Sequence, residues 1–248
     1  MRKLIAGNWK MHKTVKESLE LAAALLKGLS RTDVDVVIAP TSLAIAPLAD
    51  LLRGTAIKLA GQNIYWQDQG AYTGEISAPL LKAAGASHVL VAHSERRQYF
   101  AETEKTACLR VQAALQHGLA PILCIGETLE EREAGQTKDV LESQLSGALA
   151  GFSREQAVKM IYAYEPVWAI GTGKTASDEQ ANEAHGFVRA WLQARFGKEV
   201  AENSLVLYGG SVKPANARGL LRQKDVDGAL VGGASLQAED FLAIINAA

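Results

Sequence analysis

Short runs of consecutive apolar residues, rich in valine, isoleucine and leucine, recur along the whole chain. Such short apolar runs are typical of strands that are buried on both faces, because helices need longer segments. Eight runs occur in the 248 residues, so one begins roughly every 30 residues. The predicted strands cover residues 4–6, 34–39, 57–60, 88–92, 120–125, 160–164, 204–208 and 226–231.

Segments with apolar residues at helical spacing lie between these strands. Regular alternation of apolar strands with helices predicts an α/β protein whose parallel sheet is covered by helices. Eight such units in about 250 residues match a closed (β/α)8 barrel, and a doubly wound open sheet is the structural alternative. Because no linker or charge block divides the sequence, we expect one domain over residues 1–248. The clearest predicted helices cover residues 15–29, 105–117, 138–149, 178–196 and 239–246.

Composition and charge exclude several functional classes. The net charge is -1 and the pI about 6.5, so no overall basic field would attract nucleic acid or an anionic membrane. The N-terminal apolar stretch is too short for a signal peptide, and no run approaches the roughly 18 apolar residues of a membrane span. We therefore expect a cytoplasmic protein, consistent with only two cysteines, Cys108 and Cys124. The five histidines show no metal-ligand spacing, so no metal is expected.

Polar residues follow several predicted strands directly. Asn8 and Lys10 come after the first strand, His93 after the fourth and Glu165 after the sixth. One such residue alone is more often a solvated rim residue, but in a barrel all strands open on the same face. The sequence therefore predicts that an ammonium, an imidazole and a carboxylate converge on one mouth. Ser94, Glu95, Gly126 and Glu127 also follow strands.

Glycine-rich loops follow the last two strands, as GGS at 209–211 and GGAS at 232–235. Barrels commonly bind phosphate at these two loops, because glycine lets main-chain N–H groups approach phosphate oxygens. The alternative is that the glycines serve only as turn residues. A nucleoside triphosphate site is excluded, because GTGKT at 171–175 has Trp168 where a P-loop needs glycine. A dinucleotide site also fails, because no strand-ending acid follows 171–176.

The segment 62–77 has no helical period, although it contains Tyr65, Trp66 and Tyr72. Long irregular loops in compact domains are usually functional. Because these aromatics have no obvious partner within the chain, we expect a contact surface for a second subunit. The alternative is a loop that folds back over its own barrel.

Five motifs in order along the chain resemble the triosephosphate isomerase family. The resemblance implies interconversion of dihydroxyacetone phosphate and D-glyceraldehyde 3-phosphate, without metal or cofactor, in a homodimer of TIM barrels. The loop around 65–77 would form the dimer contact, with Thr73 reaching toward the partner's site. The motifs are GNWK at 7–10, HSERR at 93–97, YEPVWAIGTGKTA at 164–176, YGGSVKP at 208–214 and DGALVGGASL at 227–236.

The same resemblance assigns roles to individual residues. Glu165 would be the base, His93 a neutral electrophile as in other members of the family, Lys10 the cation and Asn8 a supporting polar contact. Glu95 would pair with Lys10, although an acid there could equally cap the following helix. Phosphate contacts would come from Gly171, Ser211, Gly232 and Gly233.

Residues 166–176 correspond to the family's lid. Pro166 fixes the backbone at its beginning, and Ser177 with Gln180 forms a capping box that starts a helix at its end. Two residues depart from the family pattern: His12 stands where asparagine is common, and Ala92 precedes His93 where glycine is frequent. The additional methyl group of Ala92 could change the backbone packing behind the imidazole.

The chemistry requires more than one of these groups. General-base catalysis supplies on the order of 10²- to 10⁴-fold, whereas enzymes reach at least about 10⁶. Glu165 therefore needs partners that stabilise the developing oxyanion, and His93 and Lys10 are available. A Schiff-base aldolase is the nearest rival, but Lys159 lies at the wrong strand end and Lys174 on the lid. A phosphate-binding protein without activity should lack the base or the cation.

Overall fold

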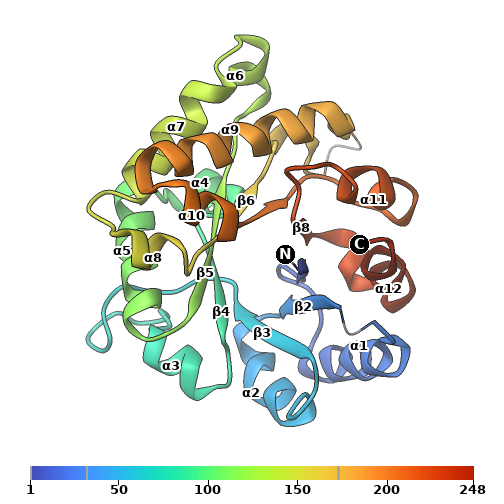
Figure 1. The fold of residues 1–248 in the computed structure, drawn as a ribbon. Coiled ribbons are helices and arrows are strands. Elements are labelled where there is room, and N and C mark those ends of the chain that lie inside the picture. Colours follow the sequence, from blue (N-terminus) through green and yellow to red (C-terminus); the bar gives the residue numbers. More distant parts are fainter. Residues whose placement is uncertain (1, 32, 172–173) are drawn as a thin grey trace.

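The computed structural model describes residues 2–31, 33–171 and 174–248 and contains a closed barrel of eight parallel strands. The strands follow one another around the barrel in chain order, with helices outside them (Figure 1). The barrel prediction is therefore confirmed and the open sheet is excluded. The strands are β1 (Lys3–Asn8), β2 (Val34–Ala39), β3 (Ile57–Gly61), β4 (His88–Val91), β5 (Ala120–Ile125), β6 (Ile161–Tyr164), β7 (Leu205–Tyr208) and β8 (Gly228–Val231).

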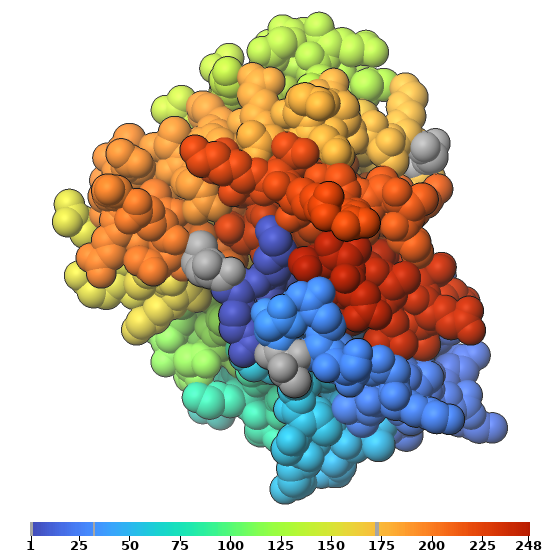
Figure 2. Space-filling view, turned by 45° about the vertical axis from the view of Figure 1, so that its right-hand side comes forward, coloured from blue at the N-terminus to red at the C-terminus, as the bar shows by residue number. Residues whose placement is uncertain are grey.

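The barrel closes between its first and last strands. β1 pairs with β2 from Lys3 opposite Val34, and with β8 from Leu4 opposite Gly228. A side chain at Gly228 would overlap the backbone of Leu4, so the glycine permits the two strands to approach. Figure 2 shows the result on the surface, where the two ends of the chain, coloured blue and red, meet.

Alternation along the strands divides the apolar residues into two cores. In β1, Leu4 and Ala6 point into the barrel, whereas Ile5 packs outward against the helices. The inner core contains branched and small residues, so the barrel is a filled interior and not a pore. Its buried members are Leu4, Ala6, Val37, Ala39, Ala60, Leu90, Ile122, Cys124, Ile161, Ala163, Leu207 and Leu230.

The helices of the outer ring match the predicted segments to within one residue at each end, and 178–196 matches at both. Shorter helices were not predicted, since several have too few residues to show a period. Among the described residues no helix is long and apolar enough to cross a bilayer. The α-helices are α1 (Val15–Gly28), α2 (Ser42–Leu51), α3 (Ala78–Ala83), α4 (Ser94–Phe100), α5 (Glu104–Gln116), α6 (Leu129–Glu133), α7 (Thr137–Ala148), α8 (Arg154–Ala157), α9 (Asp178–Phe196), α10 (Lys198–Asn203), α11 (Pro214–Leu221) and α12 (Ala238–Ala247). Two 3-10 helices are η1 (Val167–Ala169) and η2 (Gly233–Leu236).

Some predicted strand boundaries were wrong. The run 88–92 was read as a strand to its end, but β4 stops at Val91 because Ala92 has a left-handed backbone with φ of 57°. The runs 160–164, 204–208 and 226–231 begin before the strands they predict, since the residues that precede these strands, such as Met160, Ser204 and Val226, are buried as well. The predicted strand 4–6 was too short at both ends, because β1 covers Lys3–Asn8.

The irregular segment 62–77 contains its own aromatic cluster. The rings of Tyr65 and Trp66 stack with centroids 4.1 Å apart, and Tyr72 lies 4.6 Å from Tyr65. The guanidinium of Arg110 lies 5.1 Å from the Trp66 ring. The expectation that these aromatics lack partners within the chain was therefore wrong, because the loop folds on itself.

Candidate active site

A cavity of about 610 Å³ opens where the carboxyl ends of the strands meet. It is lined by side chains and backbone from loops that are far apart in the sequence. All eight site residues predicted from the sequence lie along its wall, so the structure brings the whole predicted set together. These residues are Asn8, Lys10, His93, Glu165, Gly171, Ser211, Gly232 and Gly233.

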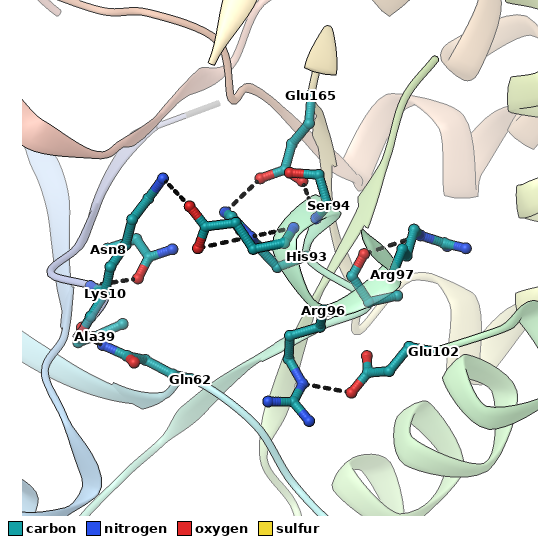
Figure 3. A network of polar contacts seen from close by, with 12 residues as sticks. Asn8, Lys10, Ala39, Gln62, His93, Ser94, Arg96, Arg97, Glu102 and Glu165 are labelled. Atoms are coloured by element: carbon teal, nitrogen blue, oxygen red, sulfur yellow. Dashed lines mark hydrogen bonds and ion pairs between the residues drawn. The ribbon is translucent and has the colours of Figure 1, made fainter. Parts of the chain in front are cut away.

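Glu165 is held where β6 ends. Its backbone N–H donates to the carbonyl of Ile125 on β5 at 2.7 Å, and its side chain is almost fully buried. A Cβ on Gly209 would lie 2.8 Å from the Glu165 Cγ, so the glycine leaves room for this side chain. The carboxylate accepts the Ser94 N–H on Oε2 at 2.8 Å, and Oε1 lies 2.9 Å from His93 Nε2 (Figure 3). A rigid barrel thus positions an acid at the edge of the cavity.

His93 is the residue that caps helix α4. Its carbonyl accepts the Arg96 N–H at 2.8 Å, and its Nδ1 accepts the Glu95 N–H at 3.2 Å. Because Nδ1 is an acceptor, the ring hydrogen of the neutral imidazole must be on Nε2. Nε2 faces Glu165 and the cavity. The local helix therefore selects the tautomer that can donate a hydrogen bond to a substrate oxygen.

Glu165 and His93 shift each other's acidity. Burial raises the pKa of Glu165. The adjacent His93 and the Ser94 N–H together lower this pKa by more than burial raises it, so the net shift is downward. Burial lowers the pKa of His93, but the Glu165 carboxylate raises it more, and the net shift is upward. Both shifts arise from the same close contact. Glu165 is consequently kept as a carboxylate, the form that can accept a proton.

Lys10 lies on the opposite wall of the cavity from Glu165 (Figure 3). Its backbone has a left-handed φ of 51°, with its N–H bonded to Asn8 Oδ1 at 3.0 Å and its carbonyl to Gln62 Nε2 at 2.7 Å. The Lys10 Nζ lies 2.5 Å from Glu95 Oε1. Glu95 therefore pairs with Lys10 and lies in the first turn of α4, where the capping residue is His93.

The glycines of the two glycine-rich loops have different surroundings. Gly232 and Gly233 line the cavity, and Gly233 starts the short helix η2. At Gly210, by contrast, a Cβ would overlap the hydroxyl of Tyr208. Gly210 therefore leaves room for the Tyr208 side chain, as Gly209 does for Glu165.

The beginning of the predicted lid is held by Glu127, a residue for which no role was predicted. Its Oε1 accepts hydrogen bonds from the Tyr164 hydroxyl at 2.9 Å and from Trp168 Nε1 at 3.0 Å. Arg132 approaches the same oxygen at 3.2 Å and lies 5.1 Å from the Trp168 ring. Glu127 is fully buried, and an acid following β5 was the available signal.

The end of the lid is fixed by the helix cap predicted from the sequence. Ser177 Oγ accepts the Gln180 N–H at 3.2 Å, and Gln180 Oε1 accepts the Ser177 N–H at 3.0 Å, which starts α9. Within the segment 166–176, residues 172 and 173 lie outside the described residues. Gly171 lies at the cavity with φ of 70°.

The fold and the cavity together define a class of protein: a barrel enzyme with a carboxylate, an imidazole and an ammonium group at one mouth, beside glycine-rich loops. Among the described residues, no group of three or more His, Cys, Asp or Glu side chains could hold a metal ion. Positively charged and N–H groups near the mouth can stabilise negative charge there.

Comparison with known proteins identifies the family within this class. The triosephosphate isomerase family profile matches residues 3–248. Triosephosphate isomerase of Citrifermentans bemidjiense is 54% identical over 99% of both chains, and that of Geotalea uraniireducens 52% identical over 99% of both. A crystal structure of triosephosphate isomerase from Bartonella henselae superposes with a TM-score of 0.91 and 44% identity, covering 100% of this chain and 99% of that one. The chain belongs to the triosephosphate isomerase family.

Proposed function

We propose that the residues around this cavity carry out the reaction of the family. The chain interconverts dihydroxyacetone phosphate and D-glyceraldehyde 3-phosphate, which moves a carbonyl by one carbon. The observation that carries this proposal is the convergence of Glu165, His93 and Lys10 on one cavity of about 610 Å³. All of the reacting groups then belong to a single barrel, which we treat as one domain over residues 1–248.

Glu165 is the proposed base. Its lowered pKa keeps it ionised, and its side chain borders the cavity that would hold the triose. It would take a proton from one carbon to give an enediolate, and then return the proton to the neighbouring carbon. Since both carboxylate oxygens face His93 or Ser94 in this structure, the carboxylate must turn from these groups toward the substrate.

His93 and Lys10 are the proposed electrophiles. When the substrate carbonyl replaces the Glu165 carboxylate at His93 Nε2, the N–H there can stabilise the oxygen that becomes negative. Lys10 adds a positive charge from the other wall, held in direction by Glu95. Asn8 supports Lys10 through the hydrogen bond of its Oδ1 to the Lys10 N–H. Preorganised donors of this kind supply the part of the rate that a base alone cannot.

The phosphate of the substrate is proposed to bind to main-chain N–H groups of Gly171, Gly232 and Gly233 and to Ser211. Closure of the lid 166–176 over the bound substrate would exclude water and limit loss of phosphate from the enediolate. Glu127 and the Ser177 cap hold the two ends of this segment.

We further propose a cytoplasmic homodimer. Large apolar side chains are exposed just beyond the first strands of the barrel, in the loops after β1 and β3 and at the start of α2: Met11 is 91% exposed, Leu43 79% and Tyr72 42%. Because β1, β2 and β3 are neighbours, these loops lie on one side of the barrel mouth. A second copy of the chain is the proposed partner at this surface, with Thr73 directed toward the partner's site.

A coupled assay tests the proposed function. Purified protein should convert glyceraldehyde 3-phosphate to dihydroxyacetone phosphate in buffer containing a chelator, without added metal. Glu165→Gln, which keeps the shape but removes the base, should lose most of this turnover. Unchanged turnover in that variant would contradict the role of Glu165, and no turnover in the unmodified protein would contradict the proposed reaction.

A further inference from the structure

The backbone immediately before His93 is strained. Ala92 is buried and has φ of 57°, in the left-handed region that a side chain with Cβ disfavours. This residue joins the end of β4 to the capping residue of α4, so its conformation sets the direction in which His93 leaves the barrel. An unfavourable conformation persists where the surroundings hold it in place.

Arg97 holds this peptide from behind. Its Nε donates to the Ala92 carbonyl at 3.0 Å, while its Nη1 lies 2.7 Å from Glu104 Oε1 at the start of α5. Nη2 is buried without a hydrogen-bond partner among the described residues, so Nε and Nη1 set the orientation of the group. The Arg97 side chain is 17% exposed and does not line the cavity.

Arg97 also contacts the backbone of His93 itself. The Arg97 backbone N–H donates to the His93 carbonyl at 3.1 Å. Arg97 thus binds the carbonyls of both Ala92 and His93, one on each side of the His93 α-carbon. The Glu95 N–H can donate to His93 Nδ1 only if the backbone at Ala92 keeps its left-handed conformation. Figure 3 shows Arg97 on the far side of His93 from Lys10.

We propose that Arg97 is a positioning residue for the reaction, which stabilises the left-handed Ala92 peptide and thereby directs His93 Nε2 into the cavity. It contacts no substrate and acts through the backbone. This inference rests on the proposed role of His93. It predicts that loss of Arg97 lowers kcat while leaving phosphate binding unchanged, because the phosphate loops are on other strands.

Arg97→Gln is the direct test. We expect kcat to fall about 10- to 100-fold, the effect of misplacing a catalytic group by up to about 1 Å. The inhibition constant of inorganic phosphate, which needs no imidazole, should change by less than about twofold. Arg97→Lys, which keeps the charge but cannot reach both partners at once, should show a smaller loss of kcat and serves if the glutamine variant does not fold.

The matched control is Glu104→Gln, which removes the other partner of Arg97 but leaves the bond to Ala92. We expect its kcat to stay within about threefold of the unmodified protein. A loss of kcat as large as that of Arg97→Gln would show that the charge pair and not the Ala92 contact matters, and would overturn the proposal.

Ala92→Gly separates positioning from general destabilisation. Glycine adopts the left-handed conformation without a Cβ penalty, so the backbone conformation at residue 92 depends less on the hydrogen bond from Arg97. The loss caused by Arg97→Gln should therefore be at least about threefold smaller in the glycine background. An equal or larger loss there would overturn the proposal.

The assay also separates failure of this inference from failure of the proposed function. His93→Gln should lower kcat strongly on its own. If it does so but Arg97→Gln does not lower kcat, the positioning role is wrong and the role of His93 stands. If His93→Gln leaves kcat unchanged, the role of His93 fails, and the positioning proposal fails with it.

Discussion

Lys10 Nζ and Glu95 Oε1 lie 2.5 Å apart across the mouth of the barrel, although the residues follow different strands, β1 and β4. The same Glu95 gives its backbone N–H to His93 Nδ1. One residue thus orients the cation through its side chain and the imidazole through its backbone. The carboxylate and the amide can be separated by substitution, because only the carboxylate is a side-chain group.

Replacing Glu95 by Gln should weaken substrate binding. The backbone N–H to His93 remains, while Lys10 loses the partner that restricts its long side chain. Because the rotamer freedom of a lysine side chain is worth about 2 kcal/mol at most, kcat/KM should fall roughly tenfold. In a Lys10→Met background the same substitution should have no further effect, and steady-state kinetics of the four proteins would show this. A full additional loss in that background would contradict the pairing.

The shifted pKa of His93 should depend on Glu165. Because the carboxylate raises the pKa of His93 against the effect of burial, Glu165→Gln should let it fall below the ordinary value of 6.5. NMR titration of the His93 ring nitrogens would measure this pKa in the unmodified protein and in Glu165→Gln. A pKa of His93 that stays above 6.5 in the variant would show that another group raises it.

The same linkage has a consequence for stability. A raised pKa of His93 in the folded state stabilises the protein below pH 6.5, and this contribution disappears as pH rises through the raised value. The lowered pKa of Glu165 stabilises above the ordinary value of 4.5 and is lost as pH falls through the lowered value. Unfolding by urea should show this pH-dependent term in the unmodified protein and not in Glu165→Gln. An identical pH dependence of the two unfolding free energies would contradict it.

Ala92→Gly should stabilise the fold. Relief of the left-handed strain is worth about 1 to 2 kcal/mol and the greater freedom of glycine in the unfolded chain offsets up to about 1, so a gain of roughly 0.5–1 kcal/mol is expected. Ala107→Gly in the helix α5 provides the control and should destabilise, because its backbone is helical and buried. Denaturant midpoints would measure both, and a loss of stability in Ala92→Gly would contradict the interpretation of φ.

The exposed apolar loops should bury against a second copy of the chain. Sedimentation velocity at micromolar concentration should give twice the mass of the 26.5 kDa chain. Leu43→Asp places a charge in the proposed interface and should shift the protein toward monomer, whereas Leu51→Asp, at the other end of α2, should not. A monomer in the unmodified protein would contradict the proposed dimer.

The sequence predicted the barrel because its signal is local and repeated. Each buried strand is a short apolar run, and the polar residues at strand ends, such as Lys10 and Glu165, must share a mouth once the strands are parallel. The cavity was predictable for this reason. The residues at which the strands begin were not predictable, because residues just before a strand, such as Met160 and Val226, are buried like the strand itself.

The contacts between side chains were not predictable from the pattern. Glu127 and Trp168 meet although 41 residues separate them, and only the packing of β5 beside β6 brings them together. The stacking of Tyr65 on Trp66 depends on the path of an irregular backbone, which has no period in the sequence. Ala92 reveals its left-handed backbone only in three dimensions, since alanine is common in every kind of structure.

The rate of Glu165→Asp tests the central claim most directly. The substitution keeps the charge but withdraws the carboxylate by about one bond, and misplacement near 1 Å costs roughly 10² in rate. Steady-state turnover of glyceraldehyde 3-phosphate should show kcat reduced by about this factor with KM little changed. A kcat equal to that of the unmodified protein would remove Glu165 from the role of base.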